Sequence, residues 1–168
     1  MLESNPSEMV TLPSGDQEHR VGGRLHRTDG PAFITADGTE EWWENGRHHR
    51  LDGPAVIAKN GLQAWYKDGD LHREDGPAVI RSHCETWYFK NMVHRDDGPA
   101  HVDVFGTRLW YRYGLKHRDD GPAVIRTDGS EEWWENGRQV EPPEMKQAPT
   151  GFIARLRKYL AAGHVLSW

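Results

Sequence analysis

The segment His-Arg-Thr-Asp-Gly-Pro-Ala at residues 26–32 decides the fold, because the same pattern returns four more times along the chain. His-Arg-x-Asp-Gly-Pro-Ala recurs at residues 49–55, 72–78, 94–100 and 117–123, so its glycines are spaced 23, 23, 22 and 23 residues apart. A fixed period of this length is the signature of a repeat protein, in which each unit packs on its neighbours. Residues 23–140 are therefore predicted to form five tandem repeats of 22–23 residues.

Each repeat carries the residues that favour β-hairpins. In the first repeat, Asp37-Gly38 precedes the aromatic pair Trp42-Trp43, and Asn45-Gly46 follows it. Such dipeptides favour type I′ turns, whose two central residues need positive φ. We expect two antiparallel strands per repeat, around residues 32–35 and 40–44, with the Asp-Gly-Pro step bending the chain because proline has no ladder donor. The fold class is predicted to be mainly β, an elongated single-sheet array of antiparallel hairpins.

The segments that flank the repeats differ from them in composition. Residues 1–22 are polar and are interpreted as an N-terminal arm or cap, while residues 141–150 hold three prolines and are predicted to be a linker. Residues 151–168 are predicted to contain an amphipathic α-helix, because apolar residues recur there at helical spacing. The apolar face of this helix is formed by Phe152, Ile153, Leu156, Tyr159 and Leu160.

Composition and charge narrow the function classes. The net charge of −5 gives no overall attraction to nucleic acid or anionic lipid. Cys84 is the only cysteine, so no intrachain disulfide or cysteine zinc cluster is expected. The first ten residues lack the basic start and apolar run of a signal peptide, and no stretch reaches membrane-spanning length. We expect a cytoplasmic protein without a cofactor.

The aromatic pairs predict two ladders on opposite faces, because neighbouring residues of a strand point to opposite sides. The first ladder is interpreted as packing: Trp42, Trp65, Trp87, Trp110 and Trp133. The second is a candidate partner-binding surface, with stacking that merely stiffens the ribbon as the alternative: Trp43, Tyr66, Tyr88, Tyr111 and Trp134. The helical residues Phe152, Leu156, Tyr159 and Leu160 are further candidates, and the helix has three alternative roles: capping the array, forming a homodimer, or contacting a partner or membrane.

The repeated His-Arg-x-Asp columns are interpreted as structural. Equivalent residues of successive hairpins lie two strands, or about 9–10 Å, apart, whereas zinc needs ligand atoms at ~2.0–2.1 Å. An active site also needs one asymmetric constellation of residues, not five copies. Neither catalytic nor metal-binding residues are therefore predicted. Arg27, Asp29 and their copies are expected to form charge-assisted ladders between repeats or to satisfy turn amides.

Residues 23–140 resemble the MORN (membrane occupation and recognition nexus) repeat, and are more similar to its bacterial variant in the YwqK-type antitoxin-like proteins. The resemblance is carried by Tyr-Lys-Asp-Gly-Asp-Leu-His at residues 66–72 and Trp-Glu-Asn-Gly-Arg-His-His at residues 43–49. Phage and bacterial proteins with tandem His-Arg-x-Asp-Gly-Pro-Ala repeats look similar as well. Gly-Pro-Ala stands here in place of the family's Tyr-x-Gly and Gly-x-Gly pairs, which places the family's lipid-binding role in doubt for this chain.

Repetition and exposed aromatics together predict a non-catalytic protein-binding module. The resemblance implies, by analogy, an antitoxin-like or phage-encoded inhibitor that binds and blocks a protein. The alternative hypothesis is a MORN-type scaffold that associates with membrane lipid through the C-terminal helix. Nucleic acid is not an expected partner.

Overall fold

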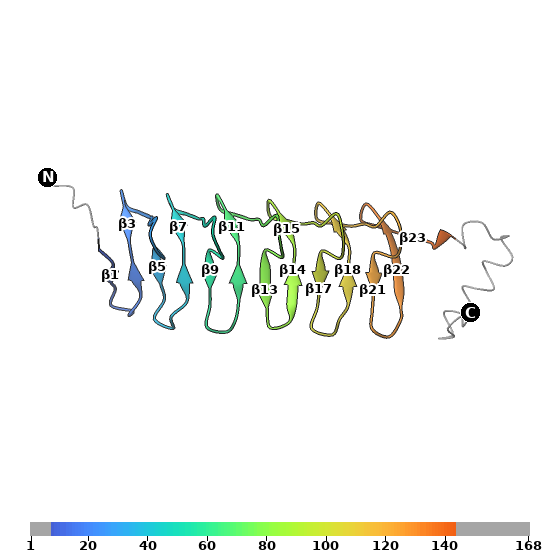
Figure 1. The fold of residues 1–168 in the computed structure, drawn as a ribbon, viewed down its shortest axis with the longest axis horizontal. Coiled ribbons are helices and arrows are strands. Elements are labelled where there is room, and N and C mark those ends of the chain that lie inside the picture. Colours follow the sequence, from blue (N-terminus) through green and yellow to red (C-terminus); the bar gives the residue numbers. More distant parts are fainter. Residues whose placement is uncertain (1–7, 144–168) are drawn as a thin grey trace.

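The computed structural model describes residues 8–143, and this part of the chain is a mainly β array of hairpins stacked along one axis (Figure 1). Its backbone is a 13-stranded antiparallel sheet in which every strand pairs with the next in the order β1-β2-β5-β6-β9-β10-β13-β14-β17-β18-β21-β22-β23. This confirms the predicted fold class. The predicted C-terminal helix lies outside the described residues. The strands of the long sheet are β1 (Val10–Thr11), β2 (Gln17–Glu18), β5 (Phe33–Ile34), β6 (Glu40–Glu41), β9 (Val56–Ile57), β10 (Gln63–Ala64), β13 (Val79–Arg81), β14 (Cys84–Thr86), β17 (His101–Val102), β18 (Arg108–Leu109), β21 (Val124–Ile125), β22 (Glu131–Glu135) and β23 (Arg138–Val140).

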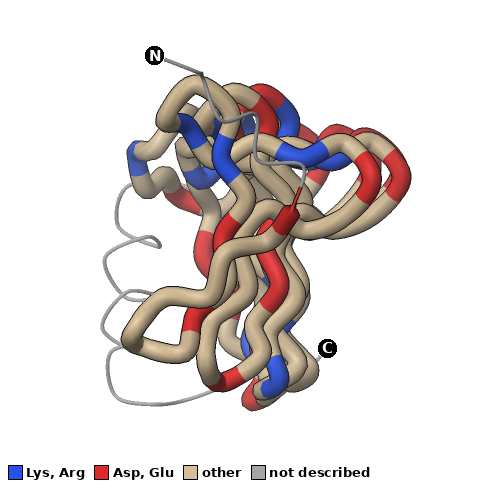
Figure 2. The backbone as a smooth tube through the Cα atoms, turned by 90° about the vertical axis from the view of Figure 1, so that its left-hand side faces the viewer, with Lys and Arg blue, Asp and Glu red and all other residues tan. Residues whose placement is uncertain are grey.

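A second row of short hairpins runs beside the long sheet, so a repeat contains more strands than the two expected. Viewed down the long axis, successive repeats lie behind one another, and their hairpins and loops project in different directions (Figure 2). In the last repeat the two rows are continuous, because β22 pairs with both β21 and β23. The other hairpins of this row are β3 (Arg20–Val21) with β4 (Arg24–Leu25), β7 (Trp43–Glu44) with β8 (Arg47–His48), β11 (Tyr66–Lys67) with β12 (Asp70–Leu71), β15 (Tyr88–Phe89) with β16 (Met92–Val93), and β19 (Tyr111–Arg112) with β20 (Leu115–Lys116).

The chain passes from one row to the other at the first residue of each aromatic pair. In the first repeat, the Trp42 amide donates to the Ala55 carbonyl at 2.8 Å, while the Trp42 carbonyl accepts from the His49 amide at 3.1 Å. The Trp42 amide therefore pairs with the strand of the next repeat, whereas the Trp42 carbonyl pairs within its own second-row hairpin. This exchange splits the single strand predicted for residues 40–44 into β6 and β7.

The turns of the second row have the predicted type I′ geometry. Both central residues have positive φ, as at Asn45 (52°) and Gly46 (78°). In the third and fourth repeats the same conformation is imposed on Lys90 (48°) and Tyr113 (47°), which lack the tolerance of asparagine or glycine. The backbone conformation is thus kept even where the favoured residue is replaced.

The turns of the long sheet differ from this expectation. Around Asp37-Gly38 only the glycine has positive φ (84°), and the Gly38 amide donates to the Thr35 carbonyl in a wider loop. The third repeat is one residue shorter here, and its loop contracts to a tight turn in which both Ser82 and His83 have positive φ. The deletion is therefore absorbed within one loop and leaves the strand pairing of β13 and β14 intact.

The core is a single column of small side chains. The alanine of each Gly-Pro-Ala segment is 0% exposed, and among the larger described side chains only Val124 is buried to a similar degree, at 1%. A ribbon this thin cannot bury large aliphatic groups, so much of its cohesion comes from the backbone ladder and from polar contacts in the loops. The alanines are Ala32, Ala55, Ala78, Ala100 and Ala123.

Each His-Arg-x-Asp-Gly-Pro-Ala loop is closed by its own arginine. The Arg50 Nε donates to Asp52 Oδ1 at 2.8 Å, and its Nη1 donates to the Pro54 carbonyl at 3.3 Å. The guanidinium lies 4.1 Å from the Trp42 ring centroid, and a Cβ at Gly53 would come within 3.1 Å of its carbon. The same Arg–Asp pair occurs in all five loops. The ion pairs are therefore local, and the expectation that they link successive repeats is wrong.

Candidate protein-interaction surface

The predicted second aromatic ladder exists as a row on the second-row hairpins. Its members occupy equivalent positions on β7, β11, β15, β19 and β22, and each is half-buried. We call these residues the aromatic row: Trp43, Tyr66, Tyr88, Tyr111 and Trp134. The structure thus places all five predicted residues of the repeats on one side of the ribbon.

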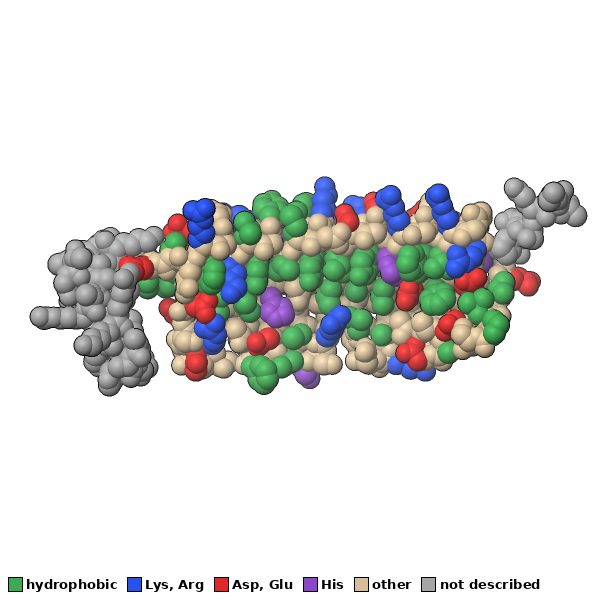
Figure 3. All heavy atoms as spheres, turned by 180° about the vertical axis from the view of Figure 1, so that it is seen from behind, with side chains coloured by type: hydrophobic (Ala, Val, Ile, Leu, Met, Phe, Trp, Pro, Cys, Tyr) green, Lys and Arg blue, Asp and Glu red, His purple; other side chains and the backbone are tan. Residues whose placement is uncertain are grey.

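The aromatic row borders a shallow groove lined by both apolar and charged side chains. The groove holds about 550 Å³, and its lining combines Tyr88, Tyr111, Leu109 and Val124 with the charged residues Asp103, Lys116 and Arg126. Hydrophobic side chains form a nearly continuous band along the ribbon on the face shown in Figure 3. A continuous apolar band of this kind is characteristic of interaction surfaces.

The two ends of the row are held by carboxylates. The Trp43 Nε1 donates to Glu41 at 2.9 Å, and the Trp134 Nε1 donates to Glu132 at 2.8 Å. The hydrogen bond from His48 lowers the pKa of the Glu41 carboxyl, and the hydrogen bond from Arg126 does the same at Glu132. Both carboxylates are thus held in the ionised form that fixes the indole rings.

The three tyrosines between these ends are not fixed in this way. Among the described residues, the hydroxyls of Tyr66, Tyr88 and Tyr111 have no hydrogen-bond partner. Partial burial of the rings raises the pKa of Tyr66 and Tyr111, so both are neutral phenols near pH 7. Each therefore offers an apolar ring together with a donor and an acceptor, which is the combination that favours tyrosine at interfaces.

The histidines of the repeat motif lie between neighbouring repeats. The Nδ1 of His117 accepts from the Asn136 amide at 3.1 Å, and its Nε2 lies 2.9 Å from Asp119 Oδ1. Nδ1 also faces a turn amide of the following second-row hairpin at His26, His49, His72 and His94. At His49 the Asp68 carboxylate additionally lies 3.0 Å from Nδ1, so the tautomer there is not fixed by the amide alone. Within residues 8–143, no three His, Cys, Asp or Glu side chains are grouped as a metal site would require.

A second kind of surface lies between successive His-Arg-x-Asp-Gly-Pro-Ala loops, and Tyr88 and Tyr111 border it as well. Three equivalent grooves of about 450, 520 and 650 Å³ open there, and we call them the loop grooves. Their rims carry the exposed acidic residues of the motif, such as Glu74, Asp75, Asp96 and Asp97. In each loop the Arg hydrogen bond lowers the pKa of the aspartate that precedes Gly-Pro-Ala: Asp29, Asp52, Asp75, Asp97 and Asp120.

The sequence analysis missed a patch that breaks the repetition. Phe89, Met92, Tyr113 and Leu115 are apolar at second-row positions where the other repeats carry charged or amide residues. Three of them are well exposed, with Met92 at 38%, Tyr113 at 53% and Leu115 at 50%. A comparison of the repeats column by column would have identified them, since no common packing requirement explains their departure.

The remaining predicted partner-binding residues, Phe152, Leu156, Tyr159 and Leu160, lie outside the described residues. Within the described part of the chain, no helix is long and apolar enough to cross a membrane. Compared with known proteins, the chain matches neither a family model nor a curated protein. The resemblance to MORN and YwqK-type repeats accordingly stays a prediction.

Proposed function

We propose that this chain is a non-catalytic protein-binding module that engages its partner through the aromatic row and the groove beside it. The observation that carries this proposal is the set of half-exposed tyrosines whose hydroxyls lack partners among the described residues. Large aromatic rings with an adjacent polar group dominate the binding energy of protein interfaces. Tyr66, Tyr88 and Tyr111 stand at one-repeat intervals and suit an extended partner surface.

The groove is better matched to a protein surface than to a small molecule. It is shallow and open, whereas small-molecule sites are concave and enclose most of their ligand. Its apolar lining includes Leu109 of the long sheet, and its polar lining includes Thr86, His101 and the charged residues Asp103, Lys116 and Arg126. An apolar centre with polar groups at the rim is the usual anatomy of a protein interface. By blocking such a partner, the chain would act as an inhibitor, which is the role that the antitoxin-like resemblance implies.

The test is capture of binding partners by variants of the full chain. Replacing Tyr66, Tyr88 and Tyr111 together with serine is expected to reduce capture from lysate of the cells that encode the chain by roughly tenfold or more. Captured proteins are quantified by mass spectrometry, and the strongest is then purified for affinity measurements. The matched control replaces Leu51 and Phe105 with serine, because both are exposed hydrophobics that do not line the groove.

A second variant separates binding from folding. Changing the same three tyrosines to phenylalanine keeps the packing and removes only the hydroxyls, so its circular dichroism and melting are expected to match those of the natural chain. Capture by this variant is expected to fall by less than in the serine variant. Undiminished capture by a folded serine variant contradicts the proposal.

A further inference from the structure

Two positions of the repeat vary together, and their pairing points to a cation that is missing from the third repeat. The residue after each aromatic pair is followed seven positions later by a residue of the next motif loop. Lys67 of the second repeat is followed in this way by Glu74, and Arg112 of the fourth by Asp119. The first repeat has neither a cation nor this acid there, with Glu44 and Leu51. The third repeat has the acid, Asp96, but its partner position is occupied by Phe89.

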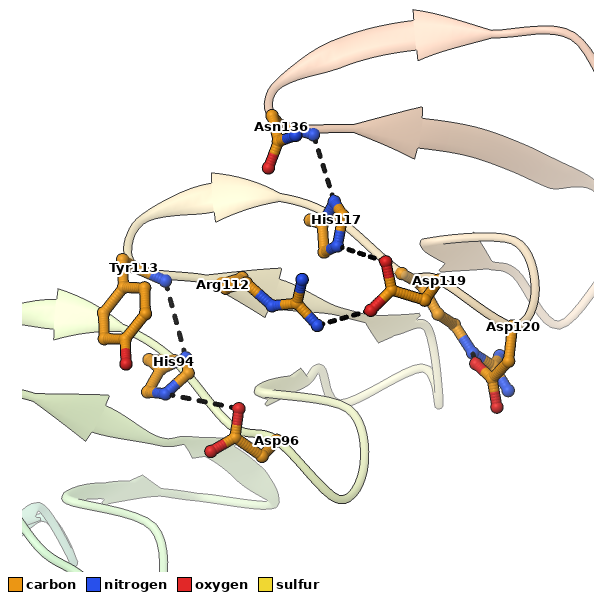
Figure 4. A network of polar contacts seen from close by, with 9 residues as sticks. His94, Asp96, Arg112, Tyr113, His117, Asp119, Asp120 and Asn136 are labelled. Carbon is orange, nitrogen blue, oxygen red and sulfur yellow. Dashed lines mark hydrogen bonds and ion pairs between the residues drawn. The ribbon is translucent and has the colours of Figure 1, made fainter.

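Among the described residues, the fourth repeat is the one in which this cation and this acid form an ion pair, since Lys67 and Glu74 do not. The Arg112 Nη2 lies 2.5 Å from Asp119 Oδ2, and the His117 Nε2 lies 2.9 Å from the other oxygen (Figure 4). Both oxygens of this carboxylate are therefore engaged by donors. The guanidinium is provided by the second-row strand β19, next to the loop that carries the acid.

The third repeat repeats this geometry without the guanidinium. The His94 Nε2 lies 3.6 Å from Asp96 Oδ1, and no described lysine or arginine forms an ion pair with Asp96 (Figure 4). The neighbouring Asp97 is paired with Arg95 and cannot compensate. One acceptor position on Asp96 thus faces a groove of about 520 Å³.

The phenylalanine at the vacant position belongs to an aromatic cluster in the same groove. The Phe89 ring centroid lies 6.3 Å from that of Tyr113 and 6.0 Å from that of His94, and the Tyr113 ring stacks on His94 at 4.1 Å. The Lys90 ammonium lies 5.5 Å from the Phe89 ring centroid, so this ring already faces one cation of the chain. In the other two loop grooves the equivalent position is basic, at Lys67 and Arg112.

We propose that the loop groove between the third and fourth repeats binds an arginine side chain of a protein partner, with its guanidinium over Phe89 and against Asp96. The groove carries a net negative charge that complements such a ligand, because Asp75 and Asp97 are paired with Arg73 and Arg95, while Glu74 and Asp96 have no described lysine or arginine partner. Exposed aromatic faces attract guanidinium groups, and a carboxylate accepts their hydrogen bonds in a fork. The exposed Met92 and Leu115 pair across their hairpins with Phe89 and Arg112, and they suit apolar contacts near that anchor.

The inference rests on the proposed protein-binding function but can fail independently of it, because the first test needs no partner. The probe is Nα-acetyl-arginine amide, titrated into the full chain carrying 13C-labelled phenylalanine and tyrosine. The chain has only 4 Phe and 5 Tyr, so the ring signals are few. Saturating NMR shifts are expected at Phe89 and Tyr113 and not at Phe33. The uncharged analogue Nα-acetyl-citrulline amide is expected to give no saturating shift.

Two variants convert the repeats into one another. Phe89→Arg supplies the chain's own guanidinium to Asp96, as in the fourth repeat, and is expected to abolish the shift of Tyr113. Arg112→Phe removes the guanidinium beside Asp119 and is expected to create a second saturating phenylalanine signal. Equal shifts with arginine and citrulline, shifts that survive Phe89→Arg, or no new site in Arg112→Phe would each overturn the inference.

Partner capture then separates the two proposals. If arginine amide binds as expected while the Tyr66/Tyr88/Tyr111 serine variant captures partners normally, the aromatic row is wrong and the loop groove stands. If that serine variant loses its partners but arginine amide does not bind, the loop-groove inference alone fails. Where both proposals hold, Phe89→Arg is expected to weaken partner capture by roughly tenfold, as loss of one anchor residue does.

Discussion

At the scale of single residues, the repeat motif is explained by one arginine and the space that it needs. Arg73 lies 4.2 Å from the Trp65 ring centroid, pairs with Asp75 at 2.8 Å, and donates to the Pro77 carbonyl. A Cβ at Gly76 would come within 2.6 Å of its guanidinium carbon. The glycine of Gly-Pro-Ala is thus needed for close approach, and not for a left-handed backbone.

Gly76→Ala is therefore expected to destabilise the chain only when Arg73 is present. In the natural chain it should displace the guanidinium and lower the free energy of unfolding by about 1–2 kcal/mol. In an Arg73→Ala background the added methyl should be neutral or stabilising by about 0.4–1 kcal/mol, because alanine restricts the unfolded chain more than glycine. Urea unfolding of the four proteins in this double-mutant cycle measures the coupling. Equal losses in the two backgrounds would show that Gly76 serves some other purpose.

At the scale of elements, the second-row hairpins are joined to one another by the motif histidines. His117 is 8% exposed, and its Nδ1 accepts a hydrogen bond from the amide of Asn136, the first turn residue of the following hairpin. The same turn is held from the other side, since the Gly137 amide donates to the Lys116 carbonyl at 2.9 Å. The histidine thus fixes the register between hairpins that do not otherwise share a sheet.

His117→Asn is expected to be milder than His117→Leu. The asparagine oxygen can stand near the position of Nδ1 and accept from the Asn136 amide, whereas leucine leaves that amide without its acceptor. We expect a difference of about 1 kcal/mol in the free energy of unfolding, measured by urea denaturation. Hydrogen exchange at Asn136 should be accelerated by leucine and little changed by asparagine. If the two variants behave alike, the histidine contributes packing and not a hydrogen bond.

The sequence was sufficient to predict an element where its conformation depends only on adjacent residues. Asn45-Gly46 predicts its type I′ turn because both central residues of that turn need positive φ, which few residues other than asparagine and glycine tolerate. It was insufficient where a contact is made across the repeat. The split at Trp42 depends on a carbonyl in the next repeat, at Ala55, and the closed loop depends on a guanidinium folding back over Gly53. The aromatic row was predictable from alternation alone, whereas the importance of Phe89 depends on what Arg112 does one repeat later.

At the scale of the whole molecule, every repeat meets the same structural requirements. A residue that departs from the repeat pattern therefore indicates a different constraint. Every repeat must keep its alanine, its arginine loop and its turns, because neighbours in a linear array depend on each other directly. Positions that these structural requirements do not fix can instead be set by function. The apolar residues Phe89, Met92, Tyr113 and Leu115 gather in the third and fourth repeats, so the array is functionally asymmetric although its backbone is nearly periodic.

The same periodicity makes acid stability a property of the whole array. In each loop the arginine hydrogen bond lowers the pKa of an exposed aspartate, as for Asp52 and Asp97. A carboxyl with a lowered folded pKa contributes stability that is fully present above its unfolded value of about 3.9 and is lost as the pH falls through the folded value. The urea midpoint is therefore expected to change little between pH 7 and 5 and to fall between pH 5 and 3, with small contributions from five loops adding together. The variant Asp52→Asn/Asp97→Asn should have a lower midpoint at pH 7 and a shallower fall below pH 5. A midpoint already lost by pH 5 would instead assign the acid sensitivity to histidine protonation, since the ordinary histidine pKa is about 6.5.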